Sequence, residues 1–276
     1  MYLVVGALGQ LGNELKLILG DKAQYVDRDE LDITDKQAVE KFFASEKFEA
    51  VINCAAYTAV DKAENDQELA RKINVEGPKF LAQTGVPLVH ISTDYVFNGE
   101  NFQPYVEEDA TDPQSVYGQT KLEGERAVME NADTAIVIRT SWLYSVFGNN
   151  FVKTMQRLGS ERESLNVVFD QVGSPSNARD LAQTIVKVLP QIKKGMKEIY
   201  HFSNEGVCSW YDFAVEIMEL LGLSCKVKPI MGRDYPTPAK RPFYSVLNKG
   251  KIKDEMGVEI RHWKEALIEC VEELGK

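Results

Sequence analysis

The chain of 276 residues has few cysteines, and their spacing excludes two classes of protein. None of the four forms a Cys-x-x-Cys pair or accompanies a histidine cluster. This pattern argues against a zinc site and against a disulfide framework. We therefore expect Cys54, Cys208, Cys225 and Cys270 to be reduced thiols, mostly in the core of a cytoplasmic protein.

Long hydrophobic runs and a surplus of basic residues are also missing. No stretch approaches the length needed to cross a bilayer, and because an apolar strand is expected at residues 2–5, we expect no signal peptide. Acidic residues outnumber basic ones by 42 to 32, which gives a formal net charge of −10. Because clustered lysines and arginines hold nucleic acids, this balance disfavours such a partner. We expect neither a membrane nor a nucleic acid as partner, whereas a small anionic substrate stays compatible with the composition.

The first half of the chain alternates apolar runs with segments of helical period, which is typical of a parallel sheet covered on both faces. Strands are expected at residues 2–5, 24–26, 50–53, 88–92 and 135–139. The spacing from Thr34 to Gln37 is that of a capping box and predicts a helix towards Ser45. Another helix is expected over residues 66–83, with a kink or restart at Gly77-Pro78.

The pattern changes after about residue 142, where polar loops at residues 170–177 and 232–242 separate shorter elements. Apolar residues three or four apart predict helices at residues 151–160, 178–189, 210–221 and 262–274. The predicted fold is α/β: a Rossmann-type doubly wound parallel sheet over residues 1–150, with a smaller, interwoven substrate lobe over residues 151–276. Some segments of this lobe are expected to return to the Rossmann domain.

A glycine-rich turn, GALGQLG, directly follows the first expected strand. In a dinucleotide-binding turn the first glycine permits a sharp reversal, the second lets backbone approach a pyrophosphate, and the third lets the helix lie close to the sheet. Gly6, Gly9 and Gly12 occupy these positions. An ordinary tight loop could have the same spacing, but the place directly after the first strand favours dinucleotide binding.

Residues after the second strand bear on the choice of dinucleotide. Asp27 lies near the distance from the glycines at which a carboxylate binds the adenosine ribose. Its neighbour Arg28 suits a 2′-phosphate instead, so NADH and NADPH both stay open. Asp32 and Ile33 are candidates to flank the adenine. Solvated charges and a turn before a helix are the alternative interpretations of these residues.

Further candidates follow the third and fourth strands. Ala56, Tyr57 and Thr58 follow the third strand, where small side chains let backbone approach a ligand or simply allow a close contact between helix and sheet. Thr93 and Asp94 end the fourth strand and bring a hydroxyl and a carboxylate to the same edge of the sheet.

Tyr117 and Lys121 are four residues apart and share one face of a helix. Of the 11 tyrosines, only Tyr117 is followed by a lysine at this spacing. A nearby ammonium favours the phenolate and lowers the pKa of a phenol from about 10, which makes it a usable proton donor. An exposed pair on a helix surface is the alternative, but the pair follows a glycine turn and a Ser-Thr strand end in the order that catalysis requires.

Seven strings between residues 6 and 242 carry a resemblance to a known family: GALGQLG, NCAAYTAVDKAE, STDYVFNG, VYGQTKLEGE, RTSWLY, GNNFVKTM and YPTPAKRP. The chain resembles the extended short-chain dehydrogenases/reductases that act on nucleotide sugars and, among these, the dTDP-4-dehydrorhamnose reductases. The resemblance implies reduction of the 4-keto group of dTDP-4-dehydro-6-deoxy-L-mannose by NADPH or NADH, the last step of dTDP-L-rhamnose synthesis.

The resemblance also implies roles for matching residues. Tyr117 would protonate the keto oxygen as hydride arrives, Lys121 would hold the nicotinamide ribose and tune Tyr117, and Thr93 would bind the reacting oxygen. The expected cofactor contacts are Gly6, Gly9, Gln10, Leu11, Gly12, Asp27, Arg28, Asp32, Ile33, Ala56, Tyr57, Thr58, Ile91, Tyr117 and Lys121. The expected substrate contacts are Thr93, Asp94, Tyr117, Trp142, Asn150 and Arg241, with Asn149, Phe151 and Pro242 beside them near the diphosphate.

Some members of the family are associated with a metal held by carboxylates between subunits. This chain has Arg179 where one of those carboxylates would lie, so we expect no metal and a monomer or homodimer.

Other functions of related proteins are the alternatives. A nucleotide-sugar dehydratase would need a glutamate at position 95, where this chain has a tyrosine. Epimerases use the same tyrosine and lysine, but the RTSW and PTPAKRP strings favour a reductase. A non-catalytic relative, such as the regulatory subunit of methionine adenosyltransferase, would not need Tyr117, Lys121 and Thr93 together. Sister reductases of stereoisomeric keto sugars stay open.

Overall fold

One parallel sheet of six strands organises the computed structural model, which describes residues 1–275. Its strand order is β10-β5-β4-β3-β1-β2, and every neighbouring pair is parallel. The strands are β1 (Tyr2–Val5), β2 (Ala23–Val26), β3 (Val51–Asn53), β4 (Leu88–Thr93), β5 (Ala135–Thr140) and β10 (Lys197–Phe202). The predicted doubly wound α/β fold is confirmed, and the five strands expected from the sequence lie within one residue of those observed.

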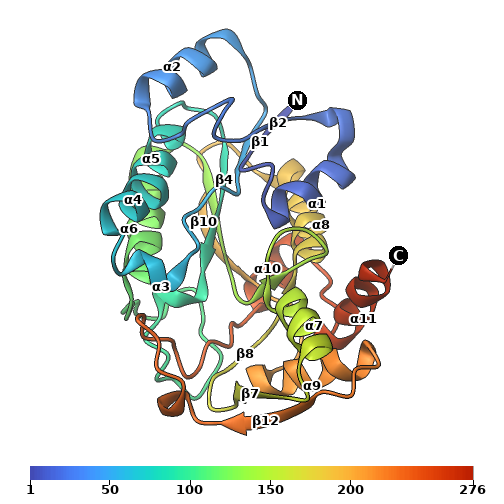
Figure 1. Ribbon diagram of the computed structural model, residues 1–276. Coiled ribbons are helices and arrows are strands. Elements are labelled where there is room, and N and C mark those ends of the chain that lie inside the picture. Colours follow the sequence, from blue (N-terminus) through green and yellow to red (C-terminus); the bar gives the residue numbers. More distant parts are fainter. Residues whose placement is uncertain (276) are drawn as a thin grey trace.

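Helices cover both faces of this sheet (Figure 1). One face carries α1 (Gln10–Leu19) and α8 (Ala178–Val188), and the other carries α4 (Gln67–Arg71), the π-helical turn η2 (Lys72–Glu76), α5 (Gly77–Ala82) and α6 (Val116–Asn131). Successive strand residues point to opposite faces, so Val4 packs with the α1 and α8 side while Leu3 and Val5 pack with the α5 and α6 side.

Two predicted helix boundaries need comment. The helix α2 (Lys36–Ser45) is capped by Asp35, whose carboxylate accepts from the backbone N–H groups of Gln37 and Ala38, so the prediction of Thr34 as its cap is wrong. The Thr34 hydroxyl instead donates to the carboxylate of Asp32 at 2.7 Å, and the carboxylate of Asp35 supplies the acceptor that a cap requires. Over residues 66–83 the helix passes through η2 and continues as α5, with its proline in the first turn.

The C-terminal half packs its own apolar cluster beneath the sheet (Figure 1). Its main elements are α7 (Phe151–Glu161), β7 (Ser164–Val168), α9 (Trp210–Leu220), β12 (Lys226–Ile230) and α11 (Trp263–Leu274), with β7 and β12 paired in parallel. The strand β10 and helix α8 also come from this half, yet β10 pairs with β5 and α8 packs with α1. The division into two lobes near residue 150 stays a prediction.

Shorter elements connect these parts. They are η1 (Gly20–Lys22), α3 (Val60–Ala63), η3 (Asp94–Val96), β6 (Leu143–Tyr144), β8 (Val172–Gly173), β9 (Ser176–Asn177), η4 (Leu189–Gln191), β11 (Cys208–Ser209), η5 (Gly232–Asp234) and α10 (Gly250–Met256). The four cysteines are free thiols, and all except Cys54 are buried. No helix within residues 1–275 is both long enough and apolar enough to cross a membrane.

Candidate active site

The turn between β1 and α1 is built on glycines for two separate reasons. Gly6 has a φ of +78°, and a Cβ atom there would lie 2.6 Å from the backbone N of Ala55 after β3. A Cβ atom on Gly12 would lie 2.4 Å from the carbonyl oxygen of Gly6. Gly9 caps the start of α1. The glycines therefore let α1 approach its own loop, and let the loop approach the end of β3.

A cavity of about 370 Å³ opens at the carboxyl ends of β1, β2 and β3. Seven residues expected to bind the cofactor line it: Gly6, Gly9, Asp27, Arg28, Asp32, Ile33 and Ala56. The positive end of the α1 dipole lies at this cavity, since Gly9 belongs to both. Backbone N–H groups at such a helix end favour an anion. The structure thus brings together residues from three separate strand ends.

Other residues of this cavity were not anticipated. They are Val5, Leu8, Leu31, Thr34, Cys54, Ala55, Leu69 and Ile73. Most adjoin a predicted residue in the chain, so a wider window around each strand end would have found them. Leu69 in α4 and Ile73 in η2 have no such signal, because only the packing of their helix against the sheet brings them to the cavity.

The two charged residues after β2 have different surroundings. Asp27 accepts a hydrogen bond from the backbone N–H of Leu8 at 2.9 Å, so its carboxylate holds the glycine turn. The side chain of Arg28 is 79% exposed, and within residues 1–275 its one ion pair is with Asp32, with 3.8 Å between Nε and Oδ2. An exposed guanidinium with one weak contact is free to bind a phosphate.

Tyr117 and Lys121 lie on α6 where this helix meets the end of β4. The cap residue Ser115 accepts from the backbone N–H of Gly118 at 3.1 Å, and a Cβ atom on Gly118 would lie 2.3 Å from the carbonyl oxygen of Tyr95. The start of α6 therefore packs tightly on the segment after β4. The ring of Tyr117 packs edge-on against Tyr95, with 5.4 Å between centroids, and the Thr93 hydroxyl lies beside the Tyr117 phenol.

Burial controls the protonation of this pair. It raises the pKa of Tyr117 to about 12, against the opposite effect of the Thr93 hydroxyl. It lowers the pKa of Lys121 to about 8, although Glu125 and Cys54 oppose the change. Our prediction that Lys121 lowers the pKa of Tyr117 is therefore wrong for this structure. The Lys121 ammonium donates to the carbonyl of Ile91 at 2.6 Å, and desolvation of the phenol dominates.

Three predicted substrate residues are engaged in contacts within the chain. Trp142 has a φ of +49° and stacks on Trp210 with 3.6 Å between ring centroids. Asn150 caps α7 and donates to the side chain of Gln10 at 3.0 Å. Both terminal nitrogens of Arg241 bind the carboxylate of Asp61, at 2.9 and 2.8 Å. The last contact joins the loop at residues 232–242 to the segment after β3.

The remaining predicted residues are spread around the sheet edge. Leu11 is in the core, and Thr58 is exposed. The Tyr57 hydroxyl donates to Asp66 at 2.8 Å. Ile91 contributes the carbonyl that holds Lys121. Asp94 is only 2% exposed and follows Thr93 directly.

Comparison with known proteins places this site in a family. The family model of the RmlD substrate binding domain matches residues 1–276. A dTDP-4-dehydrorhamnose reductase of Aggregatibacter actinomycetemcomitans is 41% identical, over 96% of each chain. The chain belongs to the dTDP-4-dehydrorhamnose reductase family.

Solved structures agree with this placement. A dTDP-4-dehydrorhamnose reductase from Clostridium acetobutylicum matches with a TM-score of 0.96 and 47% identity, over 100% of this chain and 99% of that one. The enzyme of the same name from Bacillus anthracis, solved in complex with NADP, matches with a TM-score of 0.94 and 37% identity, over 99% and 98% of the two chains.

Arg179, which stands at the expected position of a metal ligand, lies among three carboxylates in this member of the family. Its Nε is 3.1 Å from Glu14, one terminal nitrogen is 2.7 Å from Glu273, and the other is 3.1 Å from Glu269. Glu14 is only 2% exposed, so the guanidinium compensates a buried charge. Within residues 1–275, no three His, Cys, Asp or Glu side chains are grouped so that they could hold a metal ion.

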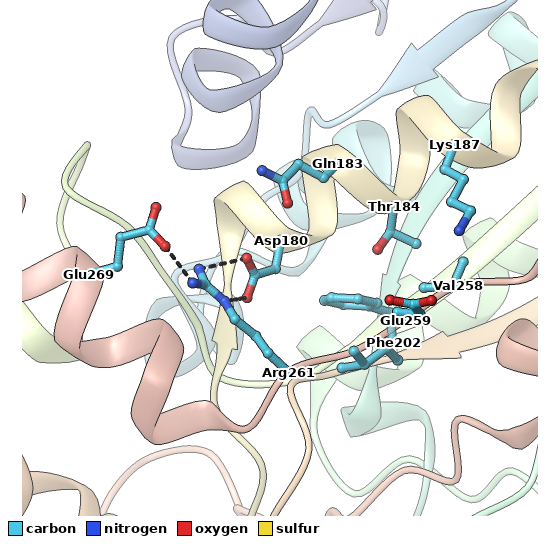
Figure 2. A pocket seen from close by; sticks show the side chains of 10 residues that line it. Asp180, Gln183, Thr184, Lys187, Phe202, Val258, Glu259, Arg261 and Glu269 are labelled. Carbon is cyan, nitrogen blue, oxygen red and sulfur yellow. Dashed lines mark hydrogen bonds and ion pairs between the residues drawn. The ribbon is translucent and has the colours of Figure 1, made fainter.

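A second cavity, of about 490 Å³, lies along α8 away from the predicted residues (Figure 2). Figure 2 shows Arg261 between Asp180 and Glu269, and the Arg261–Asp180 hydrogen bonds measure 2.9 and 2.8 Å. Lys187 donates to the carbonyl of Gly257. Arg261 is thus paired with two carboxylates and Lys187 with a backbone carbonyl, so this cavity is the weaker candidate.

Proposed function

We propose that this chain reduces the 4-keto group of dTDP-4-dehydro-6-deoxy-L-mannose to dTDP-L-rhamnose, with NADPH or NADH as the reductant. The observation that carries the proposal is the meeting of Tyr117, Thr93 and Lys121 where α6 packs on the end of β4. Relatives named for this reaction, which match nearly the whole chain, support the same substrate.

The residues of the first cavity fit a dinucleotide. The missing side chains of Gly6 and Gly12 leave the turn compact, and the start of α1 suits the pyrophosphate. Asp27 suits the adenosine ribose, and Arg28 is free for a 2′-phosphate. When bound, the nicotinamide supplies the hydride for the carbonyl carbon.

Tyr117 supplies the proton in this proposal. Because burial raises its pKa to about 12, the phenol stays protonated at neutral pH and is ready to donate as negative charge grows on the keto oxygen. Lys121 uses one donor for the Ile91 carbonyl, which leaves two for the nicotinamide ribose. Thr93 binds the reacting oxygen and so stabilises charge that develops only in the transition state.

Replacing Thr93 with valine is expected to lower kcat by roughly 10²-fold, the usual effect of removing a donor to a developing oxyanion. The dissociation constant of NADPH should change by less than about threefold, because the hydroxyl serves the substrate and the shape is kept. Steady-state kinetics and a fluorescence titration of NADPH measure the two effects. A larger loss of NADPH affinity than of kcat would assign Thr93 to the cofactor instead.

Replacing Arg28 with alanine is expected to weaken NADPH binding by roughly tenfold, since a charge-assisted hydrogen bond contributes about 1.5–3 kcal/mol. NADH lacks the 2′-phosphate and provides the control, with a change below about twofold. Parallel titrations of both cofactors measure the difference. Equal losses for NADPH and NADH would show that Arg28 contributes in some other way.

The reaction itself is tested with dTDP-glucose, the two upstream enzymes and this chain. Mass spectrometry and NMR of the sugar nucleotide should identify dTDP-L-rhamnose, together with oxidation of NADPH. A stereoisomeric 6-deoxy sugar would assign the chain to a sister reductase. A flat NADPH absorbance would instead indicate a binding protein without this activity.

A further inference from the structure

Asp94 is a buried carboxyl group at the proposed site that forms no ion pair with a cation in the described part of the chain, residues 1–275. It is 2% exposed, and its Oδ2 has no hydrogen-bond partner among residues 1–275. Its Oδ1 accepts from the Thr93 hydroxyl at 3.0 Å. The titratable and polar groups around Asp94 are Thr93, Tyr95, Tyr117 and Ser245. The charges of Asp61 and Arg241 influence the pKa of the neighbouring Tyr95. A buried carboxylate without a cation is costly, whereas the neutral acid is not.

The Thr93 hydroxyl has one donor and two acceptor positions. When Asp94 is ionised, the Thr93 hydroxyl donates its hydrogen to Asp94, and one of its acceptor positions takes the backbone N–H of Tyr95 at 3.2 Å. Thr93 then has no hydrogen left to donate to a keto oxygen. This arrangement opposes the chemistry that the proposed function requires.

Protonation of Asp94 reverses the arrangement. The acid O–H then donates to Thr93, which fills the second acceptor position and releases the Thr93 hydrogen. The Thr93 hydroxyl becomes free to donate to the same keto oxygen as Tyr117. No bond of the substrate changes in this step, because one proton is added to Asp94 and one hydroxyl rotates.

We propose that Asp94 is a positioning residue, whose acid form directs the Thr93 hydroxyl to the keto oxygen of the substrate and whose ionised form withdraws it. The inference rests on the proposed function and adds a pH dependence to it. Burial raises the pKa of Asp94 to about 7, against the opposite effects of Thr93 and Ser245. Because the acid form is the active one, the rate should be highest below this pKa and fall as the pH rises through it.

The test is the pH profile of hydride transfer in single-turnover mixing of the enzyme, NADPH and the keto sugar nucleotide from pH 5.5 to 9. The wild-type rate should fall with an apparent pKa near 7, by up to roughly 10²-fold, the loss expected from removing the Thr93 donor. In Asp94→Asn the amide N–H donates to Thr93 at every pH. Its profile should therefore lack this limb and fall only where Lys121, with its pKa lowered to about 8, loses its proton.

Two variants at Thr93 keep the test decisive if Asp94→Asn folds poorly. Thr93→Ser keeps a hydroxyl and should keep the limb near pH 7, whereas Thr93→Val should lose it, because Asp94 acts through that hydroxyl. A limb near pH 7 that persists in Thr93→Val, or the absence of this limb from the wild type, would overturn the inference. Absence of NADPH oxidation by the wild type at every pH would instead count against the proposed function.

Discussion

Replacing Tyr117 with phenylalanine is expected to lower kcat by roughly 10³-fold, within the range for loss of a general acid. The ring stays in place against Tyr95, so only the proton donor is removed. The dissociation constant of NADPH should change by less than about twofold. A loss in kcat without a loss in binding identifies a group that acts in the transition state.

Steady-state kinetics of Tyr117→Phe and Tyr95→Phe make a matched pair for this prediction. Each variant loses one phenolic hydroxyl from a half-buried ring, and the two ring centroids lie 5.4 Å apart. Tyr95→Phe should keep kcat within about threefold, because nothing in the proposed reaction uses its hydroxyl. If Tyr117→Phe kept wild-type turnover, the assignment of the proton donor would be refuted.

Replacing Arg179 with methionine is expected to lower the free energy of unfolding by about 3 kcal/mol, as when one partner of a buried ion pair is removed. The variant would leave the buried carboxylate of Glu14 without a cation, beside Glu269 and Glu273. This expected loss is at the low end of the range for removing one partner of a buried ion pair, because Arg179 and two of its partners are partly exposed. Urea unfolding at constant pH measures it.

An exposed arginine provides the control for this change. Arg157 pairs with Glu161 one turn away on α7, and both side chains are more than half exposed. Arg157→Met should therefore cost at most about 0.5 kcal/mol. Similar losses in the two variants would mean that Arg179 does not compensate a buried charge.

The pH dependence of the Arg179→Met loss follows from Glu14. Burial raises the pKa of Glu14 even with Arg179 present, and removal of the guanidinium raises it further. The folded variant then binds a proton more tightly than the unfolded chain, so rising pH destabilises it. The loss should be smaller at pH 5 than at pH 8, and a loss independent of pH would point to packing instead.

The spacing of residues along the sequence predicted much of the fold and part of the candidate site. Strands β1 to β5 were predictable because apolar runs bounded by turn residues depend only on neighbours in sequence. The turn at Gly6 was predictable for the same reason, since a positive φ is a local demand. The face shared by Tyr117 and Lys121 follows from helical geometry alone.

Such patterns could not predict contacts between segments that lie far apart in the sequence. The strand β10 joins the edge of the sheet from the second half of the chain, and Leu69 reaches the cavity from the middle of a helix. The pairing of Arg241 with Asp61 spans 180 positions and could not be foreseen from either neighbourhood. Spacing indicates which residues share a face, but not which faces meet.

The sequence by itself determined that this chain alternates strands and helices, places a glycine turn after its first strand, and presents a phenol and an amine on one helical face. Only the tertiary structure decided that Tyr117 is harder to ionise than a free phenol, that Lys121 binds the Ile91 carbonyl, and that Asp94 is buried beside Thr93. The physical reason is desolvation. The free energy of a charge depends on every atom that replaces water around it, and those atoms come from segments that only folding brings together.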